Sequence, residues 1–254
     1  MSKLCDTTVK EHIWLAPDVR LLVLHAPELA QQAKPGQFVH IRIGSTQDPL
    51  LRRPISICQA DPEEMSITLV YRIAGRGTQM LAEAKIGDML DCLGPLGHGF
   101  SLNSERPLLV GGGMGLAPLV FLAQQLCPRR VSIVMGGRSK QELYWTDLFE
   151  SLCDNIHITT NDGSLGRQGV TLDMLPELLA DGDYDRIYAC GPRPMLEGVV
   201  RAAQAYGIPS EVSLEEHMAC GIGACLVCTC DTVGGRKKVC SDGPVFPGED
   251  IRFD

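Results

Sequence analysis

The sequence predicts a β + α/β protein with an N-terminal antiparallel β-barrel, a parallel α/β domain and a small cysteine-rich C-terminal segment. Three observations support this. Short β-rich runs separated by glycine and proline fill residues 1–100. Strand-like and helix-like runs alternate over residues 101–212. Five of the eleven cysteines lie in residues 213–254. We expect three domains with these boundaries.

The barrel prediction rests on four strand-like runs in residues 1–100. They are "VRLLVLHA", "GQFVHIRIG", "MSITLVYRI" and "GDMLDCLGP", and turn signals such as "KPGQ", "ADPEE" and "GPLG" separate them. Several short strands at this spacing favour a small antiparallel barrel over a parallel sheet.

Two motifs in the barrel region suggest a ligand. In "RRPIS" (52–56), Arg53 precedes Ser56 by three residues, a spacing that points to opposite faces of a regular strand. Joint action on one ligand therefore implies a long ligand or a bend at Pro54. In "YRIAGRGTQML", a strand ends and a helix begins with Thr78 near its cap. This is either a phosphate site or a well-capped barrel corner.

The α/β domain is predicted from four strand–helix pairs. They are "RPLLV" with "APLVFLAQQL", "RVSIVMGG" with "KQELYWTDLFESL", "NIHITTND" with "VTLDMLPELLA", and "YDRIYACGP" with "PMLEGVVRAAQAYG". Strands that alternate with helices of this length form a parallel sheet.

Two turns of this domain are candidate ligand sites. "GGGMGLAP" (111–118) ends a strand and opens a helix, where backbone amides can meet a pyrophosphate. It is neither a P-loop nor a clean G-x-G-x-x-G, so a glycine turn without a ligand stays open. "YACGPRPML" places Cys190, Gly191 and Pro192 at the carboxyl edge of the sheet, where ligands bind, although a plain strand-to-helix turn is the alternative.

The cysteine spacing is the most informative motif. Cys220, Cys225, Cys228 and Cys240 follow C-x4-C-x2-C-x11-C. Plant-type [2Fe–2S] proteins share the C-x4-C-x2-C part, whereas zinc sites usually repeat CxxC twice. We therefore predict a [2Fe–2S] cluster, with a four-cysteine zinc knot as the alternative, and a segment that needs its metal to fold. Cys230 is expected to pack inward as a small apolar side chain.

Composition and charge exclude several classes of partner. The chain of 254 residues carries a net charge of −8 and has no basic run, so nucleic acid and anionic membranes are poor candidates. The N-terminus lacks the apolar core of a secretory signal, and glycines interrupt the uncharged segment 107–128. We expect no membrane span and a reducing, cytoplasmic location for the clustered cysteines.

The order of the motifs resembles the ferredoxin–NADP reductase superfamily. "PGQF", "RRPIS", "GRGT", "GGGMGLAP" and "CGPRPML" follow one another, and "EEHMACGIGACLVC" is similar, more specifically, to electron-transfer subunits of type B (NAD-dependent) dihydroorotate dehydrogenases. The resemblance covers essentially the whole chain. It implies an FAD-binding barrel followed by a nicotinamide-dinucleotide domain. Ile55 departs from the superfamily, which often has a flavin-stacking tyrosine there.

The resemblance also implies roles for individual residues. Arg53 would hold the FAD pyrophosphate, Ser56 would approach the flavin near N5, and Gly77 and Thr78 would receive phosphate. The implied FAD residues are Arg53, Pro54, Ile55, Ser56, Val70, Tyr71, Arg72, Gly77 and Thr78, and the implied nicotinamide-dinucleotide residues are Gly112, Gly113, Gly115, Cys190, Gly191 and Pro192. No residue is expected to act as a general acid or base, because the cofactors carry the chemistry.

The implied function is electron transfer in pyrimidine biosynthesis. FAD would stand between NAD(H), which exchanges hydride, and the cluster, which exchanges single electrons. The partner would be an FMN-containing catalytic subunit that oxidises dihydroorotate, in a heterotetramer of two of each. An FMN-binding barrel of about 250 residues is missing from this chain, so that chemistry would lie on another one. We expect NAD, although Arg138 and Lys140 follow a strand and could meet a 2′-phosphate.

Two other functions stay open. One is an electron-transfer subunit of another NAD(P)H-linked complex, such as a hydrogenase or a ferredoxin reductase. In the small subunit of NADH-dependent ferredoxin–NADP oxidoreductase one ligand resembles an aspartate, so four cysteines favour the dihydroorotate branch. The other is a non-redox zinc protein, which would be colourless.

Overall fold

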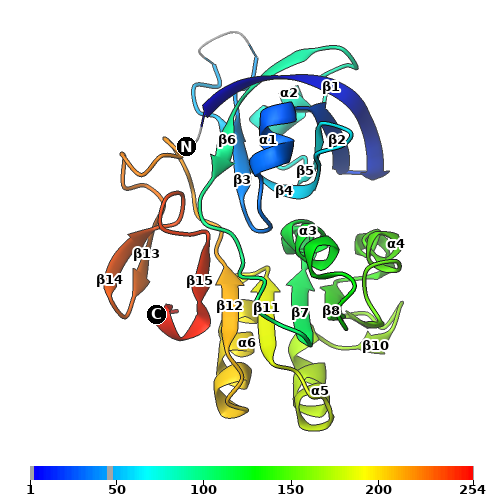
Figure 1. The fold of residues 1–254 in the computed structure, drawn as a ribbon. Coiled ribbons are helices and arrows are strands. Elements are labelled where there is room, and N and C mark those ends of the chain that lie inside the picture. The colour runs from blue at the N-terminus through cyan, green and yellow to red at the C-terminus, as the bar shows by residue number, and fades with distance from the viewer. Residues whose placement is uncertain (1–2, 45–47, 254) are drawn as a thin grey trace.

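The computed structural model describes residues 3–44 and 48–253; residues 1–2, 45–47 and 254 lie outside the described part. The expected ranges 1–100 and 213–254 include these positions. Figure 1 shows a β-barrel stacked on an α/β sheet, with the C-terminal segment beside both.

The barrel is closed and antiparallel, with the strand order β1-β2-β5-β4-β3-β6. Its strands are β1 (Lys3–Ala16), β2 (Val19–His25), β3 (Phe38–Ile41), β4 (Arg53–Asp61), β5 (Ser66–Arg72) and β6 (Met89–Leu96), with the short helices α1 (Pro27–Gln32) and α2 (Arg76–Leu81). Alternate residues such as Leu22 and Leu24 fill the interior. Closure pairs every strand on both sides, so no edge is left open.

The second sheet has seven strands in the order β10-β9-β8-β7-β11-β12-β15, all parallel except β15. The strands are β7 (Pro107–Gly112), β8 (Ser132–Gly137), β9 (Asn155–Thr160), β10 (Arg167–Gln168), β11 (Arg186–Cys190), β12 (Ser210–Ser213) and β15 (Val245–Pro247). The helices are α3 (Leu116–Leu126), α4 (Thr146–Phe149), α5 (Leu175–Asp181) and α6 (Arg193–Ala205).

Helices cover both faces of this sheet. In β7, Leu108 and Val110 share a core with α5 and α6, while Leu109 shares one with α3 and α4. This alternation follows from the two-residue period of a strand. The parallel α/β architecture expected from the sequence is thus confirmed, with one antiparallel edge strand added.

The helix expected over 140–152 is broken. A 3-10 turn covers Lys140–Glu142, and α4 spans only Thr146–Phe149. Trp145, between them, is completely buried. Tryptophan has only a modest helix propensity. Burial of the Trp145 indole therefore outweighs the local preference for one continuous helix.

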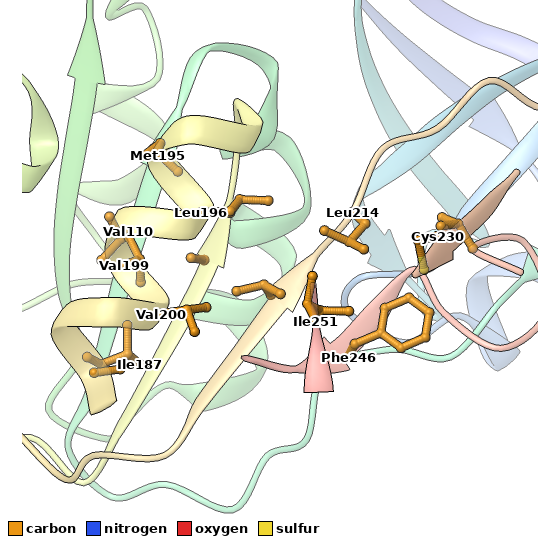
Figure 2. Packing of buried hydrophobic residues seen from close by; sticks show 14 of the residues in the cluster. Val110, Ile187, Met195, Leu196, Val199, Val200, Leu214, Cys230, Phe246 and Ile251 are labelled. Atoms are coloured by element: carbon orange, nitrogen blue, oxygen red, sulfur yellow. The ribbon is translucent and has the colours of Figure 1, made fainter. Parts of the chain in front are cut away.

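The C-terminal segment shares the core of the α/β domain. β13 (Thr229–Thr232) and β14 (Gly235–Lys238) form a hairpin, and β15 pairs with β12. Phe246 and Ile251 share one apolar cluster with Leu196 and Val200 of α6. Figure 2 shows Ile251 on the side of α6 and Phe246 farther away, on the side of Cys230. Cys230 belongs to this cluster and is only 7% exposed, which confirms that it packs inward.

Helix α3 joins the barrel to the α/β domain. Its Phe121 belongs to the barrel core, whereas its neighbours Leu119 and Leu122 belong to the α/β core. One helix therefore has side chains both in the barrel core and in the core on its own side of the α/β sheet. No helix among the described residues is long and apolar enough to cross a membrane.

We expect Phe121→Ala to lower the free energy of unfolding by about 3–5 kcal/mol, because it opens a cavity where the two cores meet. Urea unfolding followed by circular dichroism measures the change. Leu50→Ala removes an exposed side chain and should change stability by less than about 0.5 kcal/mol. Equal stability of the two variants would contradict this role of α3.

Candidate functional site

A cavity of about 350 Å³ lies between the barrel and the α/β domain. Most residues that the sequence assigned to FAD line it: Arg53, Pro54, Ile55, Ser56, Val70, Tyr71, Arg72 and Thr78. Met114 and Ala117 of the α/β domain close the far side, together with part of the segment that follows β12. The structure thus gathers residues from two strands and one helix of the barrel into one wall.

Arg53 and the start of α2 come together at one end of this cavity. The Arg53 guanidinium donates from Nη1 to the Leu51 carbonyl at 2.6 Å. A Cβ added at Gly77 would lie 2.7 Å from the guanidinium carbon, so a larger residue there would push the end of the Arg53 side chain aside. A guanidinium beside the start of a helix suits a phosphate group. The two motifs in which the sequence predicted phosphate contacts therefore lie side by side.

Thr78 stabilises the turn before α2. Its Oγ1 accepts hydrogen bonds from the amides of Ala74 and Gly75 at 3.0 and 3.2 Å and donates to the Gly75 carbonyl at 2.9 Å. The hydroxyl thus closes the capping turn, while Thr78 itself also lines the cavity.

Tyr71 is oriented by a histidine that sequence analysis missed. Its hydroxyl donates to His12 Nε2 at 2.9 Å, and His12 Nδ1 donates to the Ala84 carbonyl at 2.8 Å. The carbonyl can only accept, which places the imidazole proton on Nδ1. Burial lowers the pKa of His12 and raises that of Tyr71, so both groups are neutral. His12 lies 59 residues from Tyr71 in the sequence, and no local pattern could reveal this pairing.

A second cavity, of about 370 Å³, adjoins the first. Gly112, Gly113, Gly115, Gly191 and Pro192, all predicted for the nicotinamide dinucleotide, line it. They meet because β7 and β11 are neighbours, with Gly111 opposite Cys190. The two cavities share Arg72, Met114, Leu214, Glu215 and Glu216 and so form one continuous cleft.

Cys190 lies behind this cleft. Its side chain is 1% exposed, and burial raises the pKa of its thiol. A Cβ at Gly115 would lie 2.5 Å from the Cys190 carbonyl carbon. The Cys190 backbone therefore packs against the glycine turn, whereas its neighbours Gly191 and Pro192 face the cavity.

One of the two cations considered for a 2′-phosphate, Arg138, is already paired. Arg138 donates from Nε to Glu142 Oε1 at 2.7 Å, and its amide donates to Oε2 at 2.8 Å. Both residues line a further cavity beside Gly137 and Asn161. The carboxylate offsets the charge that a 2′-phosphate would need.

The four cysteines of the predicted cluster differ in exposure. Cys225 is exposed, Cys220 is half-buried, and Cys228 and Cys240 are buried. The amide of Cys240 donates to Cys228 Sγ at 3.4 Å, which brings these two residues together.

Backbone amides of the loop between Cys220 and Cys225 point at these sulfurs. Ala224 donates to Cys220 Sγ at 3.3 Å and Gly223 to Cys240 Sγ at 3.1 Å. Gly221 and Gly223 have positive φ, which bends the loop so that its amides face inward. Desolvation raises the pKa of Cys220, but amide hydrogen bonds outweigh it and lower the pKa to about 6. The loop is therefore suited to thiolate sulfur.

Across residues 3–44 and 48–253, no three His, Cys, Asp or Glu side chains are grouped so that they could hold one metal ion. Hydrogen bonds to the sulfurs, such as those from the loop amides, are one of the factors that set the potential of an iron–sulfur cluster.

Residues 213–218 connect the cleft with the cysteines. Ser213, Leu214, Glu215, Glu216 and Met218 all line the first cavity, and Cys220 follows two residues later. Sequence analysis did not assign these residues to a site, although "EEHM" directly precedes the cysteine motif.

Three family models match the chain. "Oxidoreductase FAD-binding domain" matches residues 6–100 and "Oxidoreductase NAD-binding domain" matches residues 109–201. "Iron-sulfur cluster binding domain of dihydroorotate dehydrogenase B" matches residues 215–252. The first two matches cover the two lobes of the cleft, and the third covers the cysteine loop. The cofactors are thus FAD, a nicotinamide dinucleotide and an iron–sulfur cluster.

Similar proteins match this chain over nearly its full length. The electron transfer subunit of dihydroorotate dehydrogenase B (NAD(+)) from Shouchella clausii is 41% identical, over 94% of this chain and 95% of that protein. Its counterpart from Fusobacterium nucleatum is 40% identical, over 99% and 100%. A solved structure of an NADH-dependent reduced ferredoxin–NADP oxidoreductase superposes with a TM-score of 0.88 at 33% identity, over 98% of this chain and 90% of that one. The chain belongs to the family of electron transfer subunits of dihydroorotate dehydrogenase B.

Proposed function

We propose that this chain carries electrons between NAD(H) and the FMN of a separate catalytic subunit, through FAD in the first cavity and a [2Fe–2S] cluster on Cys220, Cys225, Cys228 and Cys240. The observation that carries the proposal is the shared wall of residues 213–218. It borders both cavities and continues into Cys220. Electron transfer requires short separations, and one continuous wall keeps all three sites adjacent.

The residues of the chain bind and orient rather than react. When bound, FAD exchanges a hydride with NAD(H) and single electrons with the cluster. Arg53, with Gly77 and Thr78 at the start of α2, would hold the FAD pyrophosphate, and Ser56 and Tyr71, which line the first cavity, would face the flavin. Gly112, Gly113 and Gly115 let the dinucleotide approach the sheet edge between β7 and β11, and Gly191 and Pro192 face it from the other side.

Two features support the cofactor choice and the compartment. Glu142 compensates the Arg138 guanidinium, which favours NAD over NADP. The gathering of five cysteines in residues 213–254 suits metal ligands in a reducing, cytoplasmic compartment.

The partner surface in this proposal surrounds the exposed ligand Cys225. Ile222, Leu226 and Val227 are 57%, 64% and 51% exposed. Leu226 also has a φ of +61°, a conformation that leucine rarely adopts. Apolar side chains held outward beside a redox ligand suit the docking of the catalytic subunit, two copies of each making the heterotetramer.

The experiment that tests the function uses the chain alone and with its partner. The isolated chain should reduce artificial dyes with NADH but should not oxidise dihydroorotate. Adding the FMN-bearing subunit should produce NAD⁺-dependent orotate formation. Sustained orotate production by the isolated chain, or a partner that reduces ferredoxin instead, would refute the proposal.

Cys225→Ser should abolish the iron–sulfur absorbance and EPR signal while FAD stays bound, because the flavin wall belongs to another part of the cleft. Iron and flavin contents of anaerobically purified protein measure both effects. Cys127→Ser, at another exposed cysteine, should keep both cofactors. Zinc without iron in the unmodified protein would end the cluster assignment.

Arg53→Ala should weaken FAD retention roughly tenfold or more, since a charge-assisted hydrogen bond contributes about 1.5–3 kcal/mol. Flavin fluorescence after serial dilution gives the dissociation constant. Arg201→Ala, at an exposed arginine of α6, should leave it unchanged. Full FAD occupancy of the Arg53 variant after dilution would contradict the pyrophosphate role.

Leu226→Glu should weaken association with the catalytic subunit about tenfold or more, because docking would bury an unpaired carboxylate. Analytical ultracentrifugation of the mixed subunits measures the change. Tyr206→Glu, at the end of α6, also adds a charge at an exposed position and should bind normally. Unchanged binding of the Leu226 variant would show that the docking surface lies elsewhere.

A further inference from the structure

His40 is a buried histidine in β3 with no role in the cleft described so far. Its relative exposure is 0%. Neither ring nitrogen has a hydrogen-bond partner of normal geometry within the described part of the chain. Buried polar side-chain atoms nearly always have a partner. This side chain therefore calls for an explanation beyond apolar packing.

The position of His40 links the flavin wall to the cysteine loop. On one side its Cα pairs with Pro54 of β4, and Phe38, two residues earlier in β3, lines the flavin cavity. On the other side the ring lies against Gly221, the residue directly after Cys220. His40 is thus placed between the two predicted redox sites.

The contact with Gly221 is tight. A Cβ added there would lie 2.5 Å from His40 Nδ1, 3.2 Å from Cε1 and 3.3 Å from Cγ. Gly221 also has a φ of +72°, which favours glycine. The loop therefore approaches the ring at the edge that carries Nδ1.

The imidazole is neutral in this position. Burial, then the charges of Arg52 and Arg53, lower the pKa of His40 to about 4, against a smaller opposing effect of the Arg52 backbone. A neutral imidazole has one N–H to donate. Gly221, the residue directly after Cys220, faces Nδ1, so donation toward the cysteine loop requires the tautomer that carries its proton there.

We propose that His40 is a positioning residue for the iron–sulfur cluster and donates its Nδ1–H to a sulfur held by the Cys220 loop. This rests on the proposed cluster at the four cysteines. Hydrogen bonds to cluster sulfurs are one of the factors that set cluster potentials. An N–H donor here stabilises the reduced, more negative cluster and favours electron acceptance from the flavin side.

The test compares His40→Phe, which keeps a ring without an N–H, with His40→Asn, whose amide reaches the place of Nδ1. The readouts are iron content and EPR-monitored redox titration of the purified chain with its cofactors. We expect His40→Phe to keep its iron but to show an altered EPR spectrum and a cluster about tenfold harder to reduce. For a one-electron couple that is about 59 mV. His40→Asn should recover most of this shift.

The control is His25→Phe, the same change at a half-buried histidine of β2, which should leave the potential unchanged. Loss of iron in His40→Phe but not in His40→Asn would also support the donor role. Unchanged potential and spectrum in His40→Phe, or loss of iron in both variants, would overturn it. Absence of iron from the unmodified chain would instead refute the proposed cluster itself, so the two failures are distinguishable.

Discussion

The pairing of β15 with β12 determines where the cysteine loop lies. Val212 faces Phe246 across this pair, and the Leu214 amide donates to the Pro244 carbonyl at 2.9 Å. The chain therefore leaves the sheet at β12, forms the wall of the cleft and the cysteine loop, and returns to the same point. Because Phe246 and Ile251 are buried in the same hydrophobic cluster as residues of α6, the base of the loop is held by the hydrophobic core. The position of the loop beside the cleft thus depends on the α/β domain.

Arg72, the last residue of β5, lies at the centre of the cleft on its barrel side. It borders all three cavities around the cleft, and Asp18 pairs with its Nε at 3.1 Å. Its second carboxylate neighbour, Glu142, belongs to the other domain and lies 3.9 Å away. Since Glu142 also binds Arg138, one carboxylate connects the barrel to the nucleotide edge of the sheet. A change at Glu142 would therefore affect both the contact between the two lobes and the charge at that edge of the sheet.

Local patterns predicted most of the fold and most of the cleft. The cysteine spacing, the strand-like runs and the glycine turns are each contained in a few consecutive residues, so the sequence displays them directly. Long-range packing decided the rest. Burial of Trp145 broke the helix expected over 140–152, and burial of Cys190 turned its thiol away from the cavity. The rings of His12 and His40 lie against residues 59 and 181 positions away, which no local spacing could indicate.

The unequal exposure of the four cysteines sets an order for biogenesis. Cys228 and Cys240 are sealed in the interior, while Cys225 and the apolar residues around it remain open to solvent. Iron and sulfide can enter only from that open side. In the proposed complex, the same side is covered by the catalytic subunit. Metallation must then come before assembly, and a chain that meets its partner too early would be trapped without its cluster.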